Sequence, residues 1–127
     1  MSSASLLRAH RTLAAVIAVL ILVLAAIAGR AIFGPWDIEV HGYVGNGVFV
    51  LAVISFALAI YRRPGNAELT VAALIAMLTF AQVGLGYVGR EQLEAAAWHI
   101  PNGVLLMALS TYQFATLQAR VVGSADR

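Results

Sequence analysis

Long apolar runs separated by short polar segments dominate the pattern of this chain. Four of these runs reach the length of about 20 residues that a helix needs to cross a lipid bilayer; they cover about 12–30, 40–61, 69–89 and 97–119. Turn-forming or charged residues interrupt the pattern at 34–37, 62–66 and 90–94. We therefore expect an all-α integral membrane protein, an up-down bundle of four transmembrane helices in a single domain (1–127) with a polar tail at 120–127.

Composition supports this class of protein. Of the 127 residues, 61% are hydrophobic and only 11% are charged, whereas a soluble domain is nearer half apolar and a quarter charged. Cysteine is absent, which excludes disulfides, thiolate metal sites, c-type haem attachment and cysteine catalysis. The basic pI near 9.5 comes from arginines in the loops, so it bears on membrane topology and indicates no nucleic-acid partner.

The distribution of arginine predicts the orientation, because loops on the cytoplasmic side of a membrane are enriched in basic residues. With the N-terminus inside, only Arg30 and Arg90 are external. The others are all cytoplasmic: Arg8, Arg11, Arg62, Arg63, Arg120 and Arg127. We expect a multi-pass protein of the inner (plasma) membrane with both termini in the cytoplasm, with the bilayer as its first partner.

Two histidines open apolar runs on the predicted outer side. His41 begins the second run and His99 the fourth, and each is followed by Asn-Gly-Val (46–48 and 102–104). In an up-down bundle the second and fourth helices are parallel and lie across a diagonal. We therefore expect the two imidazoles to face one another across the outer half of the core.

Facing histidines in a helix bundle are typical axial ligands of haem. Small side chains share a helical face with His41, namely Val44, Gly45, Val48 and Ala52, and they leave room for a flat apolar ligand. The functional hypothesis is a b-type haem ligated by His41 and His99. The alternative is that each histidine lies at headgroup level and bonds to water, a carbonyl or a nearby acid.

The charged residues at the predicted outer ends of the helices can also be interpreted either as part of a haem site or as ordinary surface residues. Arg30 and Arg90 could bind the two haem propionates, since arginine pairs with carboxylates; alternatively they extend to lipid headgroups or pair with local acids. Asp37 or Glu39 could orient the His41 ring, although a solvated loop position is the simpler interpretation. His10, beside two arginines, is given no role.

These residues resemble one half of haem A synthase, and the chain is also similar to small four-helix bacterial membrane proteins of unknown function. The likeness rests on one histidine near the outer end of each even-numbered helix, and on Gln82-Val83-Gly84-Leu85-Gly86 leading through a short loop to Trp98-His99. The resemblance implies haem between His41 and His99. The family enzyme has two such bundles and many members have an external cysteine pair, both missing here; Ile38 replaces the acid that the family has three residues before its histidine. Methyl oxidation of haem is therefore not expected.

Two functions from different classes remain open on the sequence alone. The first is a small membrane haem protein that transfers electrons or handles haem. Its expected protein partner is a second copy of the chain or a larger membrane complex. The second is a ligand-free structural or assembly protein of the membrane. Nothing in the sequence assigns an enzymatic reaction.

Overall fold

The computed structural model describes residues 2–125, and these fold into four long helices. The helices are α1 (Ser3–Phe33), α2 (Ile38–Arg62), α3 (Asn66–Val88) and α4 (Leu93–Ala125). Three of them, α1, α2 and α3, are long and apolar enough to cross a membrane. The expected all-helical architecture is confirmed to this level.

Local chemistry explains where the helices begin and end. The Ser2 side chain accepts a hydrogen bond from the Ser5 amide (3.1 Å), and Asp37 accepts one from the Glu39 amide (2.8 Å), so each N-terminus has a capped donor. Helix α2 ends at Arg63, which adopts the left-handed conformation (φ 52°, ψ 54°). The chain reverses within three residues there, before α3 begins.

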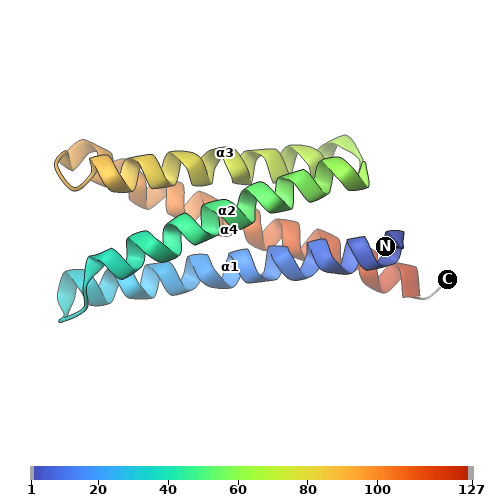
Figure 1. The fold of residues 1–127 in the computed structure, drawn as a ribbon, viewed down its shortest axis with the longest axis horizontal. Coiled ribbons are helices and arrows are strands. Elements are labelled where there is room, and N and C mark those ends of the chain that lie inside the picture. Colours follow the sequence, from blue (N-terminus) through green and yellow to red (C-terminus); the bar gives the residue numbers. More distant parts are fainter. Residues whose placement is uncertain (1, 126–127) are drawn as a thin grey trace.

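The helices form an antiparallel ring (Figure 1). Helix α1 packs against α2 and α4, and α3 packs against the same two helices, so α2 lies across the centre from α4. The two chain termini and the α2–α3 turn lie at one end of the bundle, which we call the terminal end. The α1–α2 and α3–α4 connections lie at the opposite end, which we call the two-loop end.

The interior is narrow and the outside is apolar. Ala52, Ile75 and Leu106 pack together in the core, each at most 2% exposed. Large hydrophobic side chains such as Met77 (67% exposed) and Phe80 (69%) face outwards. An exposed apolar surface of this extent is typical of a protein that is surrounded by lipid.

The helices extend beyond the expected membrane spans. Helix α1 begins at Ser3 instead of near residue 12, and α4 includes the 93–96 segment as well as the polar tail up to Ala125; residues 126 and 127 lie outside the described residues. Pro101 lies inside α4, so the helix starts well before it, and His99 is a helical residue. A backbone donor is missing at Pro101, yet the helix continues through it.

Candidate functional site

The structure brings the two expected histidines together at the two-loop end. His41 lies in the first turn of α2, and His99 lies in the second turn of α4. Their ring centroids are 5.9 Å apart, with an angle of 60° between the ring planes. Both side chains are half-buried. The diagonal arrangement of α2 and α4 therefore converts two distant sequence positions into one pair of imidazoles.

Each imidazole is oriented by a backbone carbonyl of a neighbouring helix. His41 Nδ1 lies 3.0 Å from the Leu24 carbonyl oxygen in α1, and His99 Nδ1 lies 3.1 Å from the Gln82 carbonyl oxygen in α3. A carbonyl oxygen can only accept, so both Nδ1 atoms carry the proton and donate it. In the neutral rings, Nε2 then carries a lone pair, the form in which histidine binds a metal.

Side chains of α3 and α4 hold His99 in place. Gln82 donates from Nε2 to the His99 carbonyl (2.9 Å), and Asn102 donates to Gln82 Oε1 (2.6 Å) and to the Leu78 carbonyl (3.0 Å). Gly86 lies against the imidazole, because an added Cβ there would be 3.1 Å from His99 Cε1. Gln82 thus joins α3 to α4 through interhelical hydrogen bonds, and its contact with His99 follows from the pairing of these two helices.

The face of α2 that His41 shares with Gly45, Val48 and Ala52 has unfilled space beside it. Val48 and Ala52 on this face are buried, whereas no heavy atom lies within 4 Å of a Cβ added at Gly45. Gly45 is one turn from His41 on the same side of the helix. The small-residue stripe that the sequence predicted therefore faces the core, with unfilled space at Gly45.

The two arginines at the two-loop end, Arg30 and Arg90, lie over aromatic rings. The Arg30 guanidinium carbon is 6.0 Å from the centroid of the Trp36 ring, and that of Arg90 is 5.4 Å from the Tyr87 ring. Among residues 2–125, neither arginine forms an ion pair with an acid. Local pairing with acids, one of the expected alternatives, is therefore not what the structure shows. Their charges are available to a ligand.

A hollow at the two-loop end lies next to Arg90. It has a volume of about 140 Å³ and lies between α2 and α3. The residues around it are Glu39, Gly42, Tyr43, Tyr87 and Arg90. Because Gly42 directly follows His41 in the chain, this hollow lies close to the imidazole pair.

The acids at the start of α2, Asp37 and Glu39, do not orient the Nδ1 side of His41. The Asp37 carboxylate caps α2 through the Glu39 amide, and the Nδ1 atom of His41 donates to a carbonyl of α1 instead. A backbone carbonyl thus takes the orienting role that the sequence analysis considered for a carboxylate. Helix packing, which places Leu24 beside His41, is what a pattern along one helix could not predict.

A second polar cluster lies at the terminal end, and sequence reasoning missed it. It contains one or more polar side chains from every helix: His10, Ser55, Arg62, Glu68, Gln113 and Arg120. We call it the terminal cluster. The imidazole of His10 is fully buried and Glu68 is 8% exposed. Polar and charged side chains at the terminal end of the bundle are therefore partly buried in its interior.

Glu68 is the centre of the charge pairing in the terminal cluster. Its Oε1 accepts from Arg62 (2.6 Å), and its Oε2 lies 3.1 Å from a guanidinium nitrogen of Arg120. The Arg62 guanidinium also lies 2.5 Å from His10 Nδ1. A guanidinium only donates, so Nδ1 accepts and the His10 ring is neutral with its proton on Nε2.

A helical spacing in the sequence could have indicated the burial of His10. His10, Ala14 and Ile17 recur at intervals of four and three residues, and all three are buried. The pattern places His10 on the core face of α1. Its position beside Arg8 and Arg11 suggested a solvated segment and concealed this face.

Comparison with known proteins adds no relative. The chain matches no protein-family model, no curated protein and no solved structure.

Proposed function

We propose that this protein is a small membrane protein that binds a b-type haem between His41 and His99 and transfers electrons or handles haem at the outer face of the membrane. One observation carries the proposal: two imidazoles from opposite helices converge, each with its Nδ1 proton donated to a carbonyl. This leaves both Nε2 lone pairs for a metal.

The spacing of the rings suits a bis-imidazole metal centre. A bond from a metal to an imidazole nitrogen is about 2 Å long. Two such bonds in line, together with the distance from each nitrogen to the centroid of its own ring, would separate the two centroids by about 6 Å. The observed distance is 5.9 Å. Within the described residues no third His, Cys, Asp or Glu joins the pair. Two protein ligands match an iron whose other four ligands come from a porphyrin.

The surroundings of the pair also suit haem. Arg30 and Arg90 have no acidic partner within residues 2–125 and could each bind one propionate. The open space at Gly45 lies on the core face of α2 and could receive an edge of the macrocycle. Haem held by His41 and His99 would supply one-electron chemistry, and with both histidines as ligands it would have no open site for oxygen. Electron transfer or haem carriage therefore fits better than oxygen activation.

The proposal includes the place of the chain in the membrane. The exposed apolar surface supports burial in lipid, and the arginine distribution supports N-in and C-in. The fourth helix carries more polar residues than the others, yet it packs along α1 and α3 and runs from one end of the bundle to the other. We place it across the inner (plasma) membrane with its neighbours.

A visible spectrum tests the haem proposal directly. The protein is purified in mild detergent from haem-replete cells and its spectrum is recorded oxidised and reduced, with an expected Soret band and sharp low-spin bands after reduction. His41→Ala and His99→Ala should each abolish the low-spin bands, and added imidazole should restore them. A colourless protein after haem supplementation, with unchanged helical circular dichroism, would refute haem binding and leave the structural or assembly alternative.

Glycine variants test where the macrocycle lies. Gly45→Leu fills the space on the core face of α2 and should lower haem content severalfold. Gly47→Leu is the matched control, because Gly47 is exposed on the same helix and also has no neighbour within 4 Å of an added Cβ. Equal haem content in the two variants would contradict the proposed position.

Single cysteines test the orientation, since the natural chain has none. Gln92→Cys in the α3–α4 connection should react with a membrane-impermeant maleimide in intact cells. Ser5→Cys at the terminal end should react only after the membrane is permeabilised. The reverse pattern would overturn the N-in orientation.

A further inference from the structure

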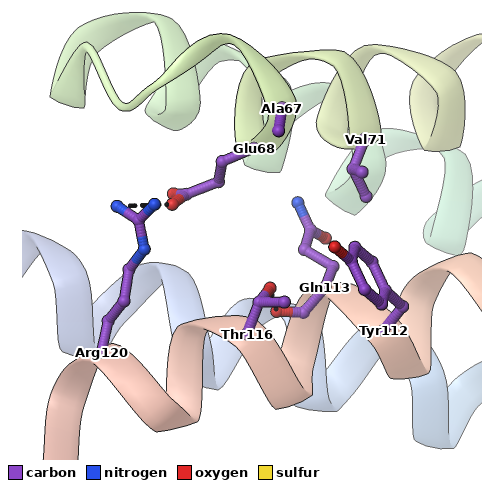
Figure 2. Close-up of a pocket in the computed structure, with 7 residues that line it drawn as sticks. All are labelled: Ala67, Glu68, Val71, Tyr112, Gln113, Thr116 and Arg120. Atoms are coloured by element: carbon purple, nitrogen blue, oxygen red, sulfur yellow. Dashed lines mark hydrogen bonds and ion pairs between the residues drawn. The ribbon is translucent and has the colours of Figure 1, made fainter. Parts of the chain in front are cut away.

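A cavity between α3 and α4 at the terminal end is lined largely by polar side chains (Figure 2). Its volume is about 80 Å³, whereas one water molecule needs about 10–15 Å³ on this measure. The cavity is therefore large enough for a small polar group. Its polar residues are Glu68 from α3 and Tyr112, Gln113, Thr116 and Arg120 from α4.

Two buried oxygen atoms of this lining lack a hydrogen-bond donor. Glu68 is 8% exposed and Gln113 is 1% exposed. Among the residues that the structure describes, Glu68 Oε2 and Gln113 Oε1 have no hydrogen-bond partner. A buried acceptor without a donor is costly. The cavity is therefore suited to an occupant that donates hydrogen bonds.

The contacts of His10 leave the Gln113 oxygen free for such an occupant. His10 Nδ1 accepts from Arg62, so the proton of the ring is on Nε2, and it is donated to Ser55 Oγ (3.0 Å). The imidazole therefore already has an acceptor. The amide nitrogen of Gln113 lies on the His10 side, 3.4 Å from Nε2, and we assign the amide in this orientation.

Thr116 adds a third acceptor to the lining. Its hydroxyl donates to the backbone carbonyl of Gln113 (2.9 Å), so the hydroxyl oxygen can still accept a hydrogen bond. The three acceptors are thus a carboxylate, an amide and a hydroxyl oxygen. A primary ammonium group has three N–H donors and a positive charge that suits the carboxylate.

Arg120 is the cation that an ammonium group would replace beside Glu68. Figure 2 shows Arg120 reaching from α4 to Glu68 on α3, at the edge of the cavity. Its nitrogen lies 3.1 Å from Glu68 Oε2, but its side chain is 53% exposed, and an exposed ion pair is weak. Arg120 can therefore turn into solvent and give access to Oε2.

The charge balance selects the carrier of the ammonium group. Glu68 also pairs with Arg62 (2.6 Å), so a free cation would add positive charge next to two guanidinium groups. A zwitterionic lipid carries a phosphate of its own and adds no net charge. A lipid headgroup therefore fits this cavity better than a free cation.

We propose that this cavity binds the primary ammonium group of a zwitterionic membrane lipid. The inference rests on the membrane placement in the proposed function and is independent of haem. Exposed apolar side chains continue from the cavity along the outside of the bundle. Leu74 (39% exposed) lies one turn after Val71, and Leu105 (47%) lies two turns before Tyr112. These leucines would contact the acyl chains.

Lipid retention measured by native mass spectrometry tests the proposal. The full chain, delipidated in a non-ionic detergent, is offered dioleoylphosphatidylethanolamine and dioleoylphosphatidylcholine. The two lipids share their chains and phosphate, but the methylated nitrogen of choline has no N–H to donate. Binding of the ethanolamine lipid should exceed that of the choline lipid by about tenfold, the effect of one charge-assisted hydrogen bond.

Variants assign this preference to the cavity. Gln113→Met removes an acceptor and Glu68→Gln removes the negative charge, so each should lose most of the preference. Arg120→Gln should keep the preference, because it removes the cation that competes with the ammonium group. Gln118→Met is the matched control, since Gln118 is an amide of the same helix that accepts from Arg11 (3.1 Å) but does not line the cavity.

Three results would overturn the proposal. They are equal retention of both lipids by the wild type, a loss of preference in Arg120→Gln, and a loss in Gln118→Met equal to that in Gln113→Met. Helical circular dichroism is recorded for every variant, and the wild type and Arg120→Gln decide if a buried substitution prevents folding. The measurement depends on neither haem nor orientation, so its failure is distinguishable from failure of the proposed function.

Discussion

Replacing Glu68 by leucine should strongly destabilise the bundle. Glu68 is 8% exposed, and its partner Arg62 has a side chain that is only 10% exposed. Removing one member of such a buried pair leaves the other charge uncompensated, which costs about 3–5 kcal/mol. The pair with Arg120 adds at most about 1 kcal/mol, because an exposed ion pair is worth little. We therefore expect a loss of about 3–5 kcal/mol in the free energy of unfolding.

A double-mutant cycle with Arg62 separates the interaction free energy of the Glu68–Arg62 pair from the other effects of each substitution. Arg62→Leu alone leaves the carboxylate in the interior with only Arg120, and it should cost a similar amount. Glu68→Leu combined with Arg62→Leu removes both charges, so most of the lost stability should return, since apolar replacement of a whole buried pair is often neutral. The free energies come from titration with sodium dodecyl sulfate, followed by far-ultraviolet circular dichroism in mild detergent.

Arg120→Leu is the control for this cycle, and it should cost about 1 kcal/mol or less. Strict additivity of the two single variants at Glu68 and Arg62 would refute the reasoning. A Glu68→Leu variant no less stable than Arg120→Leu would do the same. Either result would mean that the carboxylate is solvated in the native protein.

Three further substitutions test the packing by the same unfolding measurement. Gly89→Ala should cost about 1–3 kcal/mol by overpacking, because the added Cβ would lie 2.7 Å from the Leu85 carbonyl oxygen and 3.0 Å from the Ala96 nitrogen; wild-type stability would contradict this contact. Gly29→Ala should stabilise α1 by up to about 1 kcal/mol, since nothing lies within 4 Å of the new atom, and a loss would show a hidden clash. Gln82→Leu should cost about 1–3 kcal/mol through groups left unpaired on α4, and a smaller loss would indicate that water replaces the amide.

The sequence was sufficient to predict the helices and their antiparallel order. Apolar runs of membrane length and short polar connections determine both, because backbone groups in lipid must bond within their own helix. The helix ends were less predictable. Residues 3–11 and 120–125 are polar enough to suggest tails, yet they form helix because tertiary contacts satisfy them, as when Arg11 donates to Gln118 (3.1 Å).

The two polar sites differ in how far sequence could predict them. His41 and His99 each open an apolar run, so the bundle topology alone was enough to place them opposite each other. The terminal cluster joins residues such as His10 and Gln113, which are 103 positions apart, and their proximity depends on the contact between α1 and α4. Packing decides which face each helix turns inwards, and at the terminal end the spacing of His10, Ala14 and Ile17 was the sequence pattern that indicated it.

The apolar layer of Ala52, Ile75 and Leu106 separates the imidazole pair from the terminal cluster. A dry hydrocarbon septum of this kind is a barrier to protons and ions, because a charge entering it would lose its hydration. If a redox group is held by His41 and His99 as proposed, a proton that accompanies its electron would have to be exchanged at the two-loop end, without crossing this layer.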